Sequence, residues 1–349
     1  MNFFAFYIVW FFVVWYILLK KPIQKIYCEI MVCLPLVMFA TGRDKFLFMV
    51  DTLHYVSKFL RMSLDRVSVL YAEEPGCQIL QYIVKWLGGN VEIYFFLMAA
   101  GTIVLVNLIV RKYSPDYMMT WFLFFTNCYF QWCCNIMMQG LACAVLMLTV
   151  PFLIRKKYLI CVGLVFLAMM FHYAALIFLP FIFICSGKAF GKYTLAAAGI
   201  IICMSLVLSR YADLINVGLK YTGVLQNAIA KNKGMSWIRL GFYLIPVIMT
   251  APYYRTIWRI NDPLVNVSVN MSVILSAFSF MACMTSGILI GRITDLFICF
   301  SYILLPWAIR HLYSRNVRIA LYGMIIIVYL IKYYMEMTDS SLFYEHHFF

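Results

Sequence analysis

Residues 3–19, FFAFYIVWFFVVWYILL, decide the fold class of this chain. The stretch contains no charged side chain, and Lys20 and Lys21 follow it directly. A bilayer crossing takes about 20 predominantly apolar residues, and basic residues collect on the cytoplasmic side of a membrane. We therefore expect a first transmembrane helix with its N-terminus outside and Lys20, Lys21 and Lys25 inside. No basic residue precedes the apolar run, so we expect no cleavable signal peptide.

The composition of the whole chain leads to the same class. Of its 349 residues, 65% are apolar, 18% are aromatic and 12% are charged, and the mean hydropathy is +0.90. A soluble domain carries roughly 45–50% apolar and about 25% charged residues. This composition excludes a soluble globular protein, a disordered chain and a small secreted disulfide scaffold. We predict an all-α, polytopic integral membrane protein that forms a single membrane domain over residues 1–349.

The placement of the basic residues predicts the number of crossings. The net charge is +14, and six short clusters hold more than half of the 28 basic residues. These clusters are Lys20/Lys21/Lys25, Arg111/Lys112, Arg155/Lys156/Lys157, Lys188/Lys192, Arg255/Arg259 and Arg310/Arg315/Arg318. If all of them face the cytoplasm, each intervening stretch crosses the membrane an even number of times. This predicts about twelve helical segments, within a range of about ten to thirteen. It also gives the charge a topological role instead of nucleic-acid binding.

Three stretches depart from simple long crossings. The stretch from Tyr158 to Cys185 is too short for two full crossings, so we predict two short helices that break near Phe171-His172. Long outer loops are predicted at about residues 41–90 and 209–237. Since long loops are exempt from the positive-inside rule, anionic ligand binding is one explanation of their basic residues. The first loop has apolar residues at helical spacing, which predicts an amphipathic helix on the membrane interface. They are Leu53, Val56, Phe59, Leu60, Leu64 and Val67.

Polar groups at the predicted outer tips of the hairpins indicate one site at the outer leaflet, because ionisable groups at membrane depth are expensive. His172 fits a general base, or a histidine that ties a helix break through hydrogen bonds. Arg292 fits a bidentate phosphate ligand, or an arginine that snorkels to the interface. The remaining polar tips carry Asn127, Gln131, Asn135 and Gln139 in one hairpin and Arg210 to Lys233 in another.

Two further groups lie in the first outer loop. Asp51 and Tyr55 share one face of a helix, where they fit a sugar-binding or hydroxyl-activating pair, or a solvated face. Glu73-Glu74-Pro75-Gly76 is typical of a turn before an apolar helix, and an acidic pair at a helix N-terminus is the favoured interpretation. No DxD, HExxH or GxSxG motif occurs, and the twelve cysteines show no metal-ligand spacing. The sequence therefore predicts no cofactor and no metal.

The order of these residues resembles the EpsG family of polytopic membrane proteins, which is grouped with Wzy-type polysaccharide polymerases. The similarity spans most of the chain, and the Phe171-His172 segment is its most distinctive element. The matching elements are Arg43, Asp51-Thr52-Leu53-His54-Tyr55 with Phe59, Glu74-Pro75-Gly76, Gln139 with Ala142, Phe171 to Leu176, and Arg292 to Phe297. Met138 stands where the family has an arginine, and Met49 where it has a glycine. The first departure removes a candidate phosphate contact, so either Arg210 supplies it or the activity is altered.

The resemblance implies a metal-independent membrane glycosyltransferase in the bacterial plasma membrane, in capsule or exopolysaccharide synthesis. Its implied substrate is an undecaprenyl-pyrophosphate-linked oligosaccharide, polymerised at the outer face, and the charge placement puts both termini outside. Its implied partners are membrane lipid and a flippase and chain-length regulator of the same pathway. The expected catalytic residues are His172, Asp51 and Arg292. The expected substrate-binding residues are Arg43, Thr52, Tyr55, Glu74, Gln139 and Arg210.

The expected roles follow from the reaction. Arg43 and Arg292 would stabilise the charge that develops on the pyrophosphate, and Asp51 or His172 would take the proton from the acceptor hydroxyl. Tyr55, Glu74 and Gln139 are expected to contact sugar hydroxyls.

Other functions stay open from the sequence. A transporter or flippase for the same lipid-linked glycan predicts charges near the bilayer midplane and internal pseudo-symmetry, and neither is evident. An O-antigen ligase would use similar chemistry on another acceptor. A sugar O-acyltransferase predicts a catalytic histidine near the first helices, where only His54 is present. A non-catalytic scaffold in a glycan synthesis complex also stays open, because Met138 replaces the arginine of the family pattern.

Overall fold

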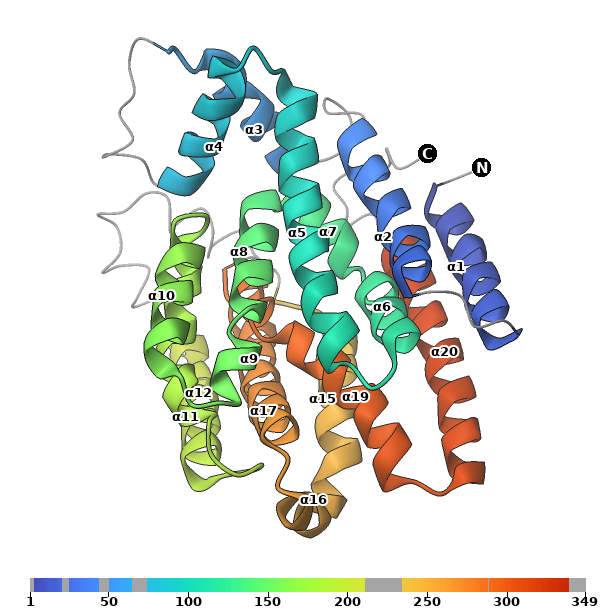
Figure 1. The fold of residues 1–349 in the computed structure, drawn as a ribbon. Coiled ribbons are helices and arrows are strands. Elements are labelled where there is room, and N and C mark those ends of the chain that lie inside the picture. Colours follow the sequence, from blue (N-terminus) through green and yellow to red (C-terminus); the bar gives the residue numbers. More distant parts are fainter. Residues whose placement is uncertain are drawn as a thin grey trace. The chain divides into compact units, whose positions relative to one another are not determined.

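The computed structural model describes residues 3–20, 25–43, 50–64, 74–210, 234–287 and 289–338, and every regular element within these ranges is helical (Figure 1). Five described helices are long and apolar enough to cross a membrane, and further apolar helices are shorter. The five are α2 (Lys25–Gly42), α5 (Val91–Tyr113), α12 (Lys192–Arg210), α17 (Pro263–Met284) and α20 (Arg315–Thr338). The all-helical class is thus confirmed for the described residues, whereas the count of about twelve segments stays a prediction.

The chain divides into two compact units, which are described separately. Unit 1 comprises residues 1–148, 166–173 and 319–349, and unit 2 comprises residues 149–165 and 174–318. Unit 1 holds α1 (Phe3–Lys20), α3 (Val50–Arg61), α4 (Pro75–Trp86), α6 (Tyr117–Thr126), α7 (Tyr129–Asn135) and α8 (Met137–Met147), besides α2, α5 and most of α20. The predicted single membrane domain stays a prediction.

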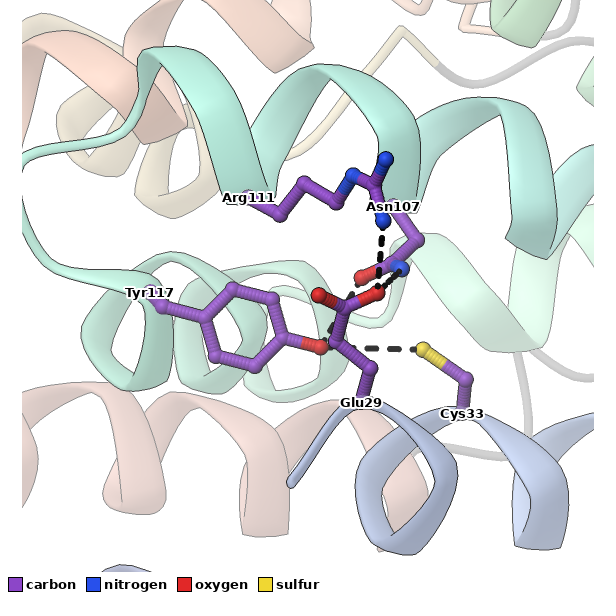
Figure 2. Close-up of polar contacts among 5 residues, drawn as sticks. All are labelled: Glu29, Cys33, Asn107, Arg111 and Tyr117. Carbon is purple, nitrogen blue, oxygen red and sulfur yellow. Dashed lines mark hydrogen bonds and ion pairs between the residues drawn. The ribbon is translucent and has the colours of Figure 1, made fainter. Parts of the chain in front are cut away.

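Helices α2 and α5 run antiparallel in unit 1, and polar groups fix one end of the pair. The Glu29 carboxylate near the start of α2 accepts hydrogen bonds from Asn107 at 2.7 Å and from Arg111 at 3.4 Å, both near the end of α5 (Figure 2). Tyr117, at the start of α6, donates to the Asn107 side-chain oxygen at 2.9 Å. Because these groups pair with one another, their burial costs little and the register of α2, α5 and α6 is set.

The predicted amphipathic helix is α3. Tyr55, Val56 and Phe59 are buried in unit 1, whereas Leu53 and Leu60 are 42% and 63% exposed. A helix on a membrane interface is expected to have apolar side chains that the protein itself does not cover, as Leu53 and Leu60 are. Its position on a membrane interface stays a prediction, and Val67 lies outside the described residues.

The predicted break near Phe171-His172 is confirmed. Helix α10 (Tyr158–Met169) ends before this dipeptide, and the chain resumes in the 3-10 helix η2 (Tyr173–Phe178) and in α11 (Leu179–Ile184). Residues 170–172 therefore expose backbone groups that other elements must satisfy.

The stretch of α6, α7 and α8 differs from the expected pair of crossings with a polar tip. It breaks at Asn127-Cys128, where Cys128 takes a left-handed conformation with φ of 60°, and again at Ile136. Asn127, Gln131 and Gln139 are at most 4% exposed. These amides thus lie inside unit 1 because the broken helices fold among their neighbours.

Unit 2 is organised on α17, which is buried on most sides. Other elements are α9 (Val150–Leu153), α15 (Trp237–Thr250), η4 (Ala251–Tyr253), α16 (Tyr254–Ile260), α18 (Gly291–Thr294) and α19 (Ile298–Leu312). Asp262 caps α17 by accepting from the Leu264 nitrogen at 2.8 Å. Asn270 donates to the carbonyls of Cys185, Gly187 and Lys188 at 3.1, 3.2 and 3.1 Å. A buried amide of α17 therefore satisfies the carbonyls freed after α11.

Candidate functional site

A histidine–carboxylate pair occupies the break after α10. The Nδ1 atom of His172 lies 2.7 Å from Oε1 of Glu74, and the two side chains are 21% and 19% exposed. Glu74 precedes α4, but its side chain does not cap that helix. The expected contact of Glu74 with sugar hydroxyls thus competes with its bond to His172. Glu74 does lie at the N-terminus of α4, as the acidic-pair interpretation expects, whereas Glu73 lies outside the described residues.

The turn Glu74-Pro75-Gly76 docks α4 onto the break. The Gly76 nitrogen donates to the Met170 carbonyl oxygen at 2.8 Å. A β-carbon on Gly76 would lie 2.9 Å from that oxygen, so only glycine fits without a shift. The Cys77 thiol donates to the Phe171 carbonyl at 3.8 Å. These contacts hold Glu74 against His172 and satisfy two backbone groups of the break.

The pair has a defined chemistry. An ionised carboxylate only accepts hydrogen bonds, so bonding to Glu74 places the imidazole proton on Nδ1 and the lone pair on Nε2. A carboxylate that orients an imidazole in this way also stabilises the imidazolium that forms when Nε2 takes a proton. Partial exposure leaves the site accessible from outside the packed core. The arrangement suits a general base.

Helix α3 brings a second carboxylate into unit 1. The Asp51 nitrogen donates to the Asn135 side-chain oxygen at 3.3 Å, which ties the start of α3 to α7. Thr52 is fully buried and Tyr55 is 8% exposed. Lys85 of α4 fixes the other end by donating to the carbonyls of Phe59, Leu60 and Met62 at 3.2, 3.1 and 2.5 Å. Tyr55 belongs to one buried cluster with Cys77, against which Phe171 packs.

Arg43 is turned inward at the end of α2. Its guanidinium donates to the Cys134 carbonyl at 2.7 Å and to the Ala40 carbonyl, and it lies over the Phe95 ring at 4.8 Å. Burial lowers its pKa from the ordinary value. The cavity beside it measures about 20 Å³, room for one water molecule. A phosphate contact by Arg43 would therefore require a rearrangement of these helices.

Met138, which stands where the family pattern has an arginine, makes buried apolar contacts. Met138 is 3% exposed and belongs to the cluster of Tyr55 and Cys77, and Gln139 beside it is 2% exposed. A methionine fills such a site without an unpaired charge. Gln139 therefore lies in the interior of unit 1, where it would meet a sugar only after an opening.

Arg292 lies in unit 2 with two charged neighbours that the sequence did not single out. Burial raises the pKa of Asp295 to about 7, and the nearby Arg239 and Arg292 oppose this shift. Arg239 comes from the first turn of α15, whereas Arg292 and Asp295 come from α18 and the residue after it. Arginine guanidinium groups are suited to bidentate binding of a phosphate, and here they lie near one carboxyl group. The side chain of Arg210 lies outside the described residues.

The structure also contains a charged pair that the sequence did not predict. Lys332 and Glu336 of α20 are 3.0 Å apart, with side chains 1% and 9% exposed. Their spacing of four residues in the last apolar run was the available signal. Among the described residues, no three His, Cys, Asp or Glu side chains gather as a metal site requires.

These features define a class: an all-helical, multi-pass membrane protein whose broken helices carry ionisable groups inside the fold. Residues 26–348 match the model of the EpsG family. No curated protein and no solved structure matches the chain. The chain belongs to the EpsG family, which is a Wzy-like polymerase family.

Proposed function

We propose that this protein joins undecaprenyl-pyrophosphate-linked oligosaccharide repeat units at the outer face of the plasma membrane, without a metal. The single observation that carries the proposal is the His172–Glu74 pair at 2.7 Å, held at a helix break by Gly76. Family membership supports the reaction class. A polymerase of this kind needs a base for the acceptor hydroxyl and cations for a departing pyrophosphate, and the chain supplies both types of group.

The proposed step transfers one glycosyl unit. An acceptor hydroxyl oxygen attacks the anomeric carbon of the donor unit, and the bond from this carbon to the pyrophosphate oxygen breaks. The hydroxyl proton passes to Nε2 of His172, while the lipid pyrophosphate leaves with the bonding electrons. Glu74 holds the imidazole and stabilises its charged form. Arg292, with Arg239, is the proposed cation of unit 2 for a pyrophosphate group.

The other predicted residues have secondary roles in this proposal. Asp51 is the alternative base, and Tyr55, Thr52 and Gln139 contact sugar hydroxyls once the site opens. Arg43 is proposed to support the site through its bonds in the interior of unit 1, because its hydrogen bonds go to protein carbonyls. Arg210 remains a proposed phosphate contact. The proposal also keeps a flippase and a chain-length regulator as partners.

A second candidate function is transport of the same lipid-linked glycan. The observation that favours it is the buried Lys332–Glu336 pair, because a transporter is expected to carry charges at membrane depth. The two functions differ in where single repeat units accumulate after deletion: outside for a lost polymerase, and on the inner leaflet for a lost transporter.

The test is the surface glycan profile of a deletion strain, resolved by size, with variants expressed at matched membrane levels. His172→Ala is expected to leave single repeat units on lipid or on the surface, a loss of roughly 10²–10⁴-fold in polymerisation. Glu74→Gln is expected to shorten the polymer less. His54→Ala is the matched control, since His54 is exposed on α3. Full-length polymer in the His172→Ala strain would contradict the proposal.

A further inference from the structure

The buried face of α20 is largely polar. Its buried residues are Ile325, Tyr329, Lys332, Tyr333 and Glu336. Their spacing follows one helical stripe, so all of them face the same neighbours. Lysine and glutamate are almost never fully buried unless they are paired. An ion pair inside an apolar span is therefore a feature that needs a specific explanation.

Lys332 bonds to the break between α6 and α7 as well as to Glu336. Its ammonium lies 3.0 Å from the Glu336 carboxylate and donates to the Asn127 main-chain carbonyl at 3.4 Å. Asn127 ends α6, and Cys128 then takes its left-handed conformation. The last carbonyls of a helix have no partner within that helix. The lysine supplies a donor to a main-chain carbonyl at this bend.

A second contact holds α7 one turn further along. Gln131 is fully buried, and its amide donates to the Tyr333 hydroxyl at 3.3 Å. Tyr333 also packs on Phe125 of α6 with ring centroids 5.4 Å apart. Lys332 and Tyr333 of α20 thus contact both sides of the break between α6 and α7. These contacts fix where α7 begins and how it is rotated about its axis.

The far end of α7 carries the acceptors of the candidate site. The Cys134 carbonyl accepts from Arg43 at 2.7 Å, and the Asn135 side chain accepts from the Asp51 nitrogen at 3.3 Å. A change in the rotation of α7 would move both acceptors, because α7 is a single short helix of seven residues. The link from α20 to Arg43 and Asp51 is therefore continuous and made of named bonds.

We infer that Lys332 is a positioning residue, which fixes α7, and through α7 Arg43 and the start of α3, by donating to the Asn127 carbonyl while Glu336 neutralises its charge. The inference rests on the proposed function only for its effect on polymer length. In this arrangement the two charged residues have unequal roles. The Lys332 ammonium is essential for holding α7, whereas the Glu336 carboxylate only neutralises its charge. A generic ion pair would make them interchangeable.

Charge-swapping variants separate these possibilities. Lys332→Met removes the donor, Glu336→Gln keeps it, and the double variant K332E/E336K restores an ion pair but places a carboxylate against the Asn127 carbonyl. Arg315→Met is the matched control, because Arg315 is an exposed cation on the same helix. All variants are made in the full chain and compared at equal membrane abundance.

Native cysteines report the position of α7 without any glycan. Cys128 and Cys134 are buried at the two ends of α7, and Cys185 is a buried reference in unit 2. Membranes are treated with N-ethylmaleimide, and modification of each cysteine is followed by peptide mass spectrometry. Lys332→Met is expected to raise the labelling rate of Cys128 and Cys134 at least tenfold, with Cys185 unchanged. Glu336→Gln is expected to change it less than threefold.

The double variant decides the inference. K332E/E336K is expected to label like Lys332→Met and to produce short polymer. If it restores wild-type labelling and polymer length, the pair is a generic ion pair and the inference is overturned, even if Lys332→Met fails to fold. Unchanged labelling in Lys332→Met overturns it as well. The two proposals can fail separately. If Lys332→Met alters the labelling but the deletion strain still makes full-length polymer, the positioning role stands and the proposed polymerase is refuted.

Discussion

Gly76 lies so close to Met170 that the hydrogen bond between their main chains, at 2.8 Å, leaves no room for a side chain. This contact joins two segments far apart in the sequence, the start of α4 and the break after α10. It brings Glu74 to His172. The geometry of the proposed base therefore depends on a residue that has no functional group.

Gly76→Ala is the direct test of this contact. The added β-carbon would lie 2.9 Å from the Met170 oxygen, so α4 must shift, at a cost of about 1–3 kcal/mol. We expect short polymer at near-normal membrane abundance, read from a size-resolved glycan profile. Gly163→Ala is the control, because nothing lies within 4 Å of a β-carbon there. Equal polymer lengths in the two variants would contradict the docking role.

Arg292 is expected to act through the shape of its guanidinium. Arg292→Ala should lower polymerisation roughly 10²–10³-fold, as for the loss of one charge-stabilising donor. Arg292→Lys should restore little, because an ammonium cannot bind a phosphate bidentately. Glycan size profiles measure both. Arg255→Ala removes an exposed arginine of unit 2 that bonds to the Tyr254 hydroxyl, and should have no effect. Wild-type polymer length in the Arg292→Lys strain would show that position 292 needs a positive charge and not a bidentate guanidinium.

Asp295 gives unit 2 a dependence on pH. Burial raises its pKa from 3.8 to about 7, so the folded chain holds this proton more tightly than the unfolded chain. The free energy of unfolding therefore falls as pH rises from about 4 to about 7, and is level above that range. Asp295→Asn removes the slope. The melting temperature of the detergent-solubilised protein at pH 5 and pH 8 measures it.

The expected difference is a larger drop in the wild type than in Asp295→Asn, by roughly 2–4 °C for each kcal/mol involved. Equal drops in the two proteins would show that Asp295 is not the responsible group. Arg239→Met sharpens the comparison, since loss of an opposing cation should move the pKa of Asp295 further upward.

Lys85 is expected to hold the end of α3. Lys85→Met removes donors to three carbonyls, at a cost of about 1–3 kcal/mol for the groups left unsatisfied. We expect faster tryptic cleavage at Lys58 and Arg61 in detergent, followed by mass spectrometry. Lys20→Met is the control, because Lys20 lies over the Tyr16 ring of its own helix, α1. An unchanged cleavage rate would mean that packing of Tyr55 and Phe59 alone secures α3.

Several parts of the fold were readable from local pattern. Apolar length predicted helices such as α1, helical spacing predicted α3, and the short interval before Cys185 predicted the break at Phe171-His172. Each of these depends on neighbours along the chain or on bilayer thickness. The turn Glu74-Pro75-Gly76 was recognised, but its partner Met170 was not, because a contact across so many residues leaves no periodic signal.

The candidate site was harder to predict because its polar residues are inside the fold. Arg43 and Gln139 were expected to face a substrate, yet they are buried, since α7 and α8 fold back among the helices of unit 1. Lys332 and Glu336 were not singled out from the sequence. A pair of opposite charges four residues apart is common on exposed helices, and its burial and the bond to Asn127 distinguish this one.

The antiparallel pair of α2 and α5 has one further consequence. Glu29 and Arg43 attach the two ends of α2 to α5, and they lie about 20 Å apart along the helix axis at 1.5 Å per residue. A single residue inserted between them would rotate one anchor by about 100° relative to the other. A change of about seven residues, close to two whole turns, would restore the rotation but move the anchors about 10 Å further apart along the axis, so α5 would have to change by the same length. The two anchors therefore constrain the length of this segment more strongly than the side chains between them.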